Sequence, residues 1–204
     1  LGADDVRLWV CLHDVAHHAV LGIPHVGERM EELVDSYMTG FRTDPGGLER
    51  ALDDIDPSDP SGLEAVQRIF TDPEVLMGAS ASPAQDEVRP RLDALVAVVI
   101  GWVDHVMDRV GDGLVGSYPQ VTEAMRRRRI ETSPADRYVE RLFGLDLTRD
   151  RVDLGAAFVD GVVDRAGEEG LARLWRRVEH LPTPAELEAP GLWLARIDLD
   201  PEPF

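Results

Sequence analysis

Lysine is absent from this chain, whose 21 basic residues are all arginine. This absence excludes a lysine Schiff base and the lysine of a phosphate-binding P-loop. Cysteine occurs once, at Cys11, so an internal disulfide bond and a zinc site built from several cysteines are also excluded. A single cysteine suits a reducing compartment, and we therefore expect a cytoplasmic protein.

Long apolar runs and an excess of positive charge are lacking as well. The longest apolar run, residues 95–103, is interrupted by Gly101 and is far shorter than the roughly 20 residues of a membrane span. The 39 acidic and 21 basic residues give a net charge of -18, which repels phosphate backbones and anionic lipid headgroups. We therefore expect neither nucleic acid nor a membrane surface as a partner. The composition leaves the oligomeric state open.

Apolar residues recur at three- and four-residue spacing along most of the chain, which is typical of amphipathic helices. Residues 90–110 are apolar on most sides, so this segment is predicted to be a central, buried helix. The sequence thus predicts an all-α, mainly helical domain over residues 1–197, followed by an acidic tail at 198–204. Helices are expected at residues 5–21, 28–41, 63–70, 73–77, 90–110, 119–130, 134–143, 150–166, 168–178 and 184–188.

The chain starts at Leu1, almost inside the first predicted helix. We therefore expect a fragment of a longer protein that lacks its N-terminal part. At 204 residues the chain is still long enough to bury one sizeable core.

Two histidines of the first predicted helix, His13 and His17, are four residues apart and lie on one helical face, where both could bind one metal ion. This is the spacing of a zincin helix. In the usual His-Glu-x-x-His form the glutamate is the general base that activates zinc-bound water, and here Asp14 holds that position. Spacing alone also allows the histidines to line a polar face. A catalytic zinc ion needs a third protein ligand as well.

Six segments are informative together: residues 8–18 (LWVCLHDVAHH), 99–108 (VIGWVDHVMD), 123–129 (EAMRRRR), 142–145 (LFGL), 181–186 (LPTPAE) and 189–196 (APGLWLAR). They resemble an uncharacterised zincin-like metallopeptidase family of GC-rich bacteria that is associated with the biosynthesis of a deazaflavin coenzyme. The resemblance covers nearly the whole chain.

The resemblance implies zinc as cofactor and a zincin-like arrangement in which the histidine helix packs near the central helix. It also implies a Glu-Gly-x-x-Asp motif on a later helix, whose glutamate is the third ligand and whose aspartate supports the ligands. His13 and His17 match the family's histidines, and Asp104 matches its aspartate. Two positions depart from the pattern, because Asp14 replaces the base and Ile100 replaces the ligand glutamate.

The two departures differ in severity. Asp14 keeps a carboxylate, but being one methylene shorter it sits roughly 1.5 Å further from the water, and a misplacement of about 1 Å can cost about 10²-fold in rate. Ile100 can neither coordinate metal nor accept a proton, which is a larger loss than the roughly 10- to 100-fold effect of changes around the ligands.

Asp104 is the better substitute for the lost ligand, because it shares the helical face of Ile100. It lies about 6 Å further along the helix axis, so the helix would have to slide for Asp104 to reach the metal. His105 is rotated by about 140° from Ile100 and is expected to face elsewhere. Accepting the Nδ1 proton of a histidine is the more plausible role for Asp104.

Four consecutive arginines, Arg126, Arg127, Arg128 and Arg129, could bind an anionic substrate. In so acidic a chain we expect them instead to neutralise nearby carboxylates. Cys11 is expected to be a small buried hydrophobe, whereas His18, His25 and His180 are expected at the surface or at helix ends. Gly155 and Gly161 suggest close helix contacts.

Three hypotheses for the function follow. We favour a zincin-like metallopeptidase homologue with a degenerate site, inactive or weakly active, that binds a peptide or protein partner or acts as a scaffold. The alternative is an active zinc-dependent metallohydrolase with Asp14 as base and Asp104, a water or a residue outside the chain as third ligand. In the third, a helical module takes part in coenzyme synthesis and its histidines bind no metal. The sequence names no substrate.

Overall fold

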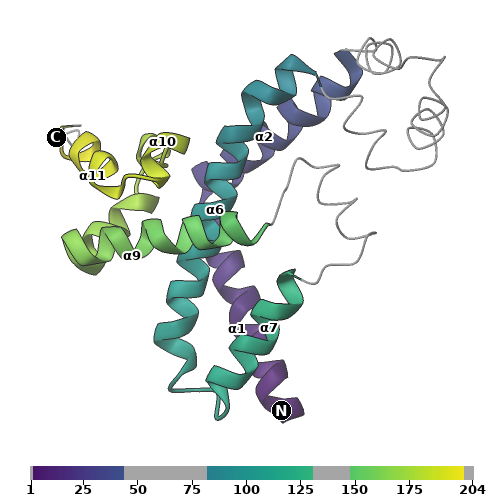
Figure 1. Ribbon diagram of the computed structural model, residues 1–204, viewed down its shortest axis with the longest axis vertical. Helices are drawn as coiled ribbons and strands as arrows, with labels where there is room; N and C mark the ends of the chain where they lie inside the picture. Colours follow the sequence, from purple (N-terminus) through teal and green to yellow (C-terminus); the bar gives the residue numbers. More distant parts are fainter. Residues whose placement is uncertain (1, 44–81, 131–147, 200–204) are drawn as a thin grey trace, which may run out of the picture. The chain divides into compact units, whose positions relative to one another are not determined.

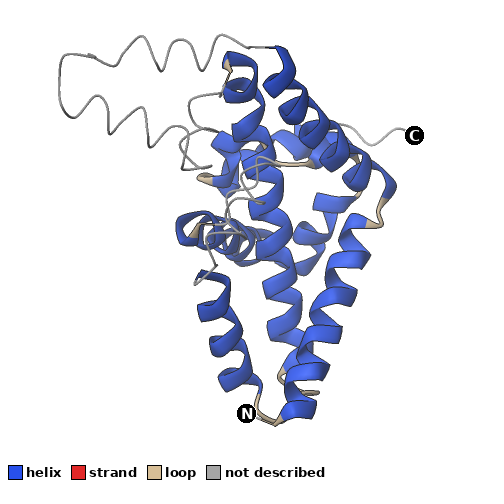
Figure 2. Ribbon diagram, turned by 90° about the vertical axis from the view of Figure 1, so that its right-hand side faces the viewer, coloured by secondary structure: helices blue, strands red, loops and turns tan. Residues whose placement is uncertain are grey.

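The computed structural model describes residues 2–43, 82–130 and 148–199, without the side chains of residues 41–43, 129 and 130. Every regular element in these stretches is helical (Figure 1 and Figure 2), so the predicted all-α class is confirmed for them. None of the helices described there has the length and apolar character needed to cross a membrane. The elements, in chain order, are α1 (Ala3–Leu21), α2 (Pro24–Thr43), α6 (Pro83–Gly111), α7 (Tyr118–Ile130), α9 (Arg149–Ala172), η1 (Arg173–Trp175), η2 (Val178–His180), α10 (Pro184–Leu187) and α11 (Pro190–Leu199).

The helices expected at residues 5–21, 28–41, 90–110, 119–130 and 184–188 are confirmed by α1, α2, α6, α7 and α10. The break expected between residues 166 and 168 is present as a kink, because Gly167 adopts a φ of 66° inside α9. Helix α11 was not expected; it ends at Leu199, and the acidic tail expected at 198–204 stays a prediction. The helices predicted at 63–70, 73–77 and 134–143 lie outside the described residues.

The chain divides into two compact units. Unit 1 comprises Leu1–Glu31, Asp93–Thr132 and Asp146–Phe204, and unit 2 comprises Glu32–Leu92 and Ser133–Leu145. The single domain expected over residues 1–197 stays a prediction. All candidate site residues belong to unit 1.

Helix α6 supplies much of the core of unit 1. Between residues 94 and 100 every side chain is buried, including Ala97, Val98 and Ile100, and burial continues at Val103 and Met107. A helix that is apolar on most sides can be stable only when other elements surround it, which is why the sequence pattern predicted a buried helix. The prediction of a central, buried helix is therefore confirmed.

Helices α6 and α9 cross in unit 1 with their backbones in close contact. A Cβ atom added at Gly155 would lie 1.9 Å from the carbonyl oxygen of Ala97, and one added at Gly101 would lie 2.4 Å from the carbonyl carbon of Gly155. Only glycine fits at these two positions. A Cβ at Gly161 would lie 2.7 Å from Pro190 of α11, so the expected close contacts at Gly155 and Gly161 are both confirmed.

A hydrogen-bonded network holds the C-terminal elements of unit 1 together. His180 is buried, with its Nδ1 atom 2.8 Å from the Arg173 carbonyl oxygen, and the Trp193 indole N–H donates to the His180 carbonyl oxygen at 2.6 Å. The surface position expected for this histidine was wrong, because the ring is buried, but the alternative of a capping histidine agrees with its contact to Arg173, the C-cap residue of α9. The second ring nitrogen, Nε2, lies 2.9 Å from Nη2 of Arg177.

In unit 2, the start of α6 is capped by a reciprocal pair of hydrogen bonds. The Ser82 backbone N–H donates to Oε1 of Gln85 at 2.9 Å, and the Gln85 backbone N–H donates to Oγ of Ser82 at 3.3 Å. The Gln85 amide also donates to the Tyr37 carbonyl oxygen on α2 at 3.2 Å. Gln85 is fully buried, and these bonds satisfy its polar atoms.

Candidate functional site

Three aromatic rings lie in a row along α1. Trp9 stacks on His13 with ring centroids 4.7 Å apart, and the His13 and His17 centroids are 4.4 Å apart. The row follows from the four-residue spacing, which places all three side chains on one face of the helix. The Trp9 indole N–H donates to Oγ1 of Thr122 on α7 at 3.0 Å in buried surroundings. This bond and the packing of α1 on α7 fix the face that carries the histidines (Figure 1).

The His17 ring is oriented by the backbone of its own helix. Its Nδ1 atom lies 3.0 Å from the His13 carbonyl oxygen, and because a carbonyl oxygen can only accept, Nδ1 carries the proton. The Nε2 atom of a neutral ring then keeps its lone pair, which is the tautomer that a metal ligand needs. His18 makes the same bond to the Asp14 carbonyl oxygen at 2.9 Å, but its ring is exposed.

Asp14, the expected base, is exposed and lines a shallow depression together with Cys11, Val15, His18 and Ala19. The structure therefore places this carboxylate beside the row of rings and open to solvent. Cys11 is exposed, so the expectation of a buried hydrophobe there was wrong. A helix packed on one side only leaves such positions open, and Val15 is 66% exposed next to them.

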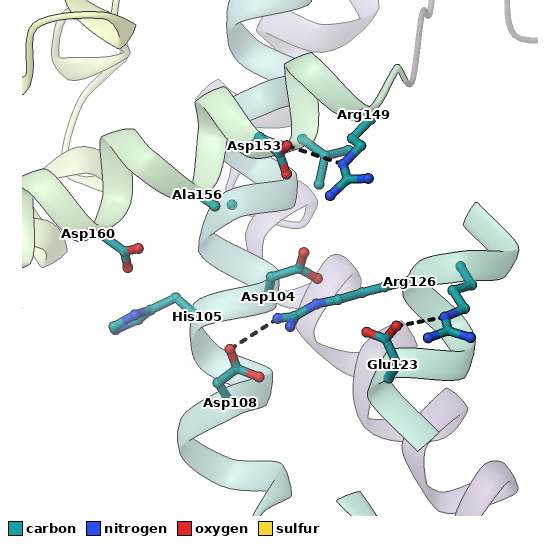
Figure 3. A pocket seen from close by; sticks show the side chains of 12 residues that line it. Asp104, His105, Asp108, Glu123, Arg126, Arg149, Asp153, Ala156 and Asp160 are labelled. Carbon is teal, nitrogen blue, oxygen red and sulfur yellow. Dashed lines mark hydrogen bonds and ion pairs between the residues drawn. The ribbon is translucent and has the colours of Figure 1, made fainter. Parts of the chain in front are cut away.

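Asp104, the expected partner of the histidines, lines a cleft of about 590 Å³ enclosed by α6, α7 and α9 (Figure 3). Its support of His13 or His17 stays a prediction. The sequence analysis missed most of the other charged residues of this cleft, although four-residue spacings such as 104/108 and 149/153 are visible signals of shared helical faces. The lining consists of Gly101, Asp104, His105, Asp108, Glu123, Arg126, Arg127, Arg149, Val152, Asp153, Ala156 and Asp160.

The arginines of the cleft pair with carboxylates. Arg126 on α7 lies 3.2 Å from Asp108 on α6, Arg127 lies 2.6 Å from Glu123, and Arg149 lies 3.5 Å from Asp153. This agrees with the expectation that the arginine run neutralises nearby acids. Arg128 is exposed and does not line the cleft, and the side chain of Arg129 lies outside the described residues.

Asp108 is held from two sides. The hydroxyl of Tyr118 donates to its Oδ1 atom at 2.7 Å, while Arg126 lies against its Oδ2 atom. Burial of the phenol and the hydrogen bond to Asp108 together raise the pKa of Tyr118 to about 12, so the hydroxyl stays protonated and remains a donor. The ring of Tyr118 packs where a Cβ of Gly111 would be, which fixes the turn between α6 and α7.

His105 sits at the edge of the cleft and was expected to face elsewhere. Its Nε2 atom lies 3.0 Å from Oε1 of Glu168, which also pairs with Arg109. Glu168 directly follows the kink at Gly167, so these contacts attach the second half of α9 to α6. His105 therefore has a structural partner in Glu168 as well as a place in the lining of the cleft.

Comparison with known proteins places this chain. Residues 1–194 match the model of a family described as zincin-like metallopeptidases. The chain belongs to this family. A crystal structure from Chloroflexus aurantiacus of a "putative hydrolase with a novel fold" is similar to this zincin-like chain, with 28% sequence identity and a TM-score of 0.65. The alignment covers 98% of this chain and 53% of the other, so the chain spans about half of that protein's length. No curated protein matches the chain.

Membership of a zincin-like family implies a zinc ion, and the described residues fit one only in part. His13 and His17 are adjacent, and His17 has the tautomer of a ligand. Ile100, where the resemblance places the third ligand, is apolar and only 8% exposed. Within the described stretches no group of three His, Cys, Asp or Glu side chains could hold a metal ion. The donor set for a catalytic zinc ion is therefore incomplete there.

Proposed function

We propose that this zincin-like chain is a degenerate metallopeptidase homologue, which keeps the helical scaffold and two histidines, has lost or greatly weakened hydrolysis, and binds a peptide or protein partner. The observation that carries the proposal is the buried isoleucine at position 100. A carboxylate there would supply both a third bond and a negative charge to a dication, and isoleucine supplies neither.

The second support is the residue at the position of the general base, Asp14. Asp14 is exposed, and its carboxylate is one methylene shorter than the glutamate of a zincin helix. A general base works only within hydrogen-bond reach of the proton that it takes. A shortened and solvated carboxylate meets this condition less well, so loss of rate adds to loss of metal affinity.

One observation favours the alternative of a working hydrolase. Asp104 presents a partly exposed carboxylate one helical turn after Ile100, and together with the oriented His17 ring it would be the nearest substitute ligand on α6. In that case Asp14 would act as the base. Zinc and hydrolysis measured on the unmodified chain separate the two proposals.

The first experiment measures the zinc content and peptide hydrolysis of the untagged chain. We expect less than stoichiometric zinc after purification and no hydrolysis of a quenched-fluorescence peptide library above the level of a His13→Ala, His17→Ala control. Stoichiometric zinc together with hydrolysis that a chelator abolishes would instead establish the working enzyme. Zinc content unchanged by the double alanine substitution would show that the histidines bind no metal.

The second experiment restores the missing ligand. Ile100→Glu combined with Asp14→Glu is expected to tighten zinc binding at least about 100-fold, measured by competition with a chromogenic chelator. The matched control is Val99→Glu with Asp14→Glu, because Val99 is also buried, at 4% exposed against 8% for Ile100, but points in another direction from the helix. Circular dichroism checks that both variants fold. Equal zinc affinity of the two folded variants would remove the main support for a lost ligand at position 100.

A further inference from the structure

One face of α1 carries apolar side chains that are open to solvent. Leu8 is 40% exposed, Val15 is 66% exposed, and Cys11 between them is exposed as well. With His18 they form a seam along the helix, at spacings of three, four and three residues. This is the spacing by which one helix pairs with another. The buried side chains of α1 lie on a different face and are Trp9, Ala16 and Val20.

A shallow depression on the seam has the outline of a socket for a side chain of a facing helix. It is lined by Cys11, Asp14, Val15 and His18, with Ala19 beside them. The first four are neighbours on the helix surface, because they lie three or four residues apart. In paired helices, four such residues form the hole that receives one side chain of the facing helix. The shape of the depression therefore favours a helix as its occupant.

The charges beside the seam indicate which helix fits. Arg7 and Asp14 flank the seam on the same side, seven residues apart, and both are exposed. When two such helices run antiparallel, this flank of one copy meets the same flank of the other, so each Arg7 lies beside an Asp14. A parallel pair would place them beside Leu12 and Ala19, which carry no charge. The contact of Arg7 with Asp4 in its own helix, at 3.2 Å, is exposed and therefore weak.

We propose that α1 is the contact between two copies of this chain, paired antiparallel about a two-fold axis near Cys11. In this arrangement Leu8 of each copy enters the depression at Val15 of the other copy. A contact of one helix with another is small, so the dimer is weak. The net charge of -18 on each copy opposes association, but at physiological ionic strength this repulsion is screened over about 8 Å. Pairing goes beyond the proposed function, because it needs neither zinc nor hydrolysis.

Sedimentation equilibrium of the reduced chain, from about 1 µM to about 1 mM, measures the association. We expect the average mass to rise from one chain toward two. Val15→Asp places a charge in the seam of both copies and should raise the dissociation constant at least about tenfold. Leu192→Asp is the matched control, because Leu192 is 60% exposed on α11 and the net charge changes equally. The control should alter the dissociation constant less than about twofold.

An exchange of charges tests the direction of the pair. Arg7→Asp and Asp14→Arg should each raise the dissociation constant about three- to tenfold, because each places like charges together twice. The double variant has the net charge of the wild type and should return to within about twofold of its dissociation constant. Its Asp4 contact stays lost, so this recovery reports the contact between copies. Circular dichroism checks that every variant folds.

Cross-linking tests the position of the two-fold axis. A short bismaleimide should join Cys11, the sole cysteine, to Cys11 of the other copy in the wild type and in Leu192→Asp. The yield of the cross-linked dimer should fall in Val15→Asp at the same protein concentration. An equal yield in Val15→Asp would show that the reagent joins copies that collide at random, and would overturn the proposed contact.

Two other results would overturn the proposal. A chain that stays monomeric at about 1 mM leaves this face to a different protein. A dimer that Val15→Asp and Leu192→Asp weaken equally, or that the double charge exchange does not restore, is held together by another surface or in another direction. The proposed function is decided separately, because zinc content and hydrolysis are not read from sedimentation or cross-linking.

Discussion

The crossing of α6 and α9 can be tested by adding a single methyl group. In Gly155→Ala the new Cβ would lie 1.9 Å from the carbonyl oxygen of Ala97 and 2.6 Å from its carbonyl carbon. Both are main-chain atoms inside a buried helix, so no side-chain rotation relieves the contact. The helices must move apart by about 1.1 Å before the contact reaches 3.0 Å, below which real Cβ atoms are essentially never found.

Two effects of opposite sign set the change in the free energy of unfolding of Gly155→Ala. Alanine is a better helix former than glycine by about 1 kcal/mol, which favours the variant. Overpacking of a core costs about 1–3 kcal/mol, and here the displaced helix also carries Phe158, Val159 and Val162, all fully buried. Because backbone rather than a side-chain tip must yield, we expect the upper end of that range. The net loss in the free energy of unfolding is then about 2 kcal/mol.

Urea denaturation followed by circular dichroism measures this loss. Gly113→Ala is the matched control, because a Cβ there meets nothing within 4 Å. Its free energy of unfolding should stay within about 0.5 kcal/mol of the wild type. If Gly155→Ala is as stable as Gly113→Ala, the two helices do not cross at the distance described and the packing argument is refuted.

Two further perturbations address the contacts around the site and the C-terminal network. The hydrogen bonds that Glu186 accepts from Arg196 and Thr183 outweigh its burial and hold the pKa of its carboxyl below the ordinary value of 4.5. The ionised Glu186 carboxylate therefore stabilises the fold above its unfolded-state pKa, and this stabilisation is lost as pH falls through its folded-state pKa. Glu186→Gln should lower the free energy of unfolding by about 1–3 kcal/mol at neutral pH. The same variant should also make the free energy of unfolding less dependent on pH below about pH 5. Thr122→Val removes the acceptor of the buried Trp9 indole N–H and should cost about 1–2 kcal/mol in urea denaturation, whereas Thr122→Ser keeps a hydroxyl and should cost less.

Each of these has a contradicting result. A Glu186→Gln protein whose stability falls with acid as steeply as that of the wild type would show that other carboxylates dominate the acid response. Glu188→Gln is the control, because Glu188 is an exposed carboxylate two residues further along the chain. For the indole bond, equal stability of the valine and serine variants would mean that Trp9 is held by packing alone.

The local part of this protein is predictable from its sequence. Helical periodicity depends on neighbours three and four residues apart, and it placed α1, α7, most of α9 and the end of α6 close to their observed bounds, whereas α6 begins seven residues before the predicted start, at Pro83. The same local geometry puts His13 and His17 side by side, because both belong to one helix. That Ile100 cannot bind a metal ion needs no structure at all, since isoleucine lacks donor atoms in any conformation. Helix α11 was missed although Pro190 stands at its first position, where proline is favoured.

The arrangement of side chains from different helices was decided by tertiary packing. No spacing along the chain brings Asp108, Arg126 and Asp160 to one cleft, because they lie on three helices whose relative positions depend on long-range contacts. Burial of His180 and exposure of Cys11 depend likewise on what packs against each helix face. The sequence by itself determined most of the described helices and the neighbouring positions of His13 and His17, because both depend on local chemistry. Only the tertiary structure decided which charged side chains of α6 and α9 lie close together, because this depends on the close crossing of the two helices that Gly101 and Gly155 permit.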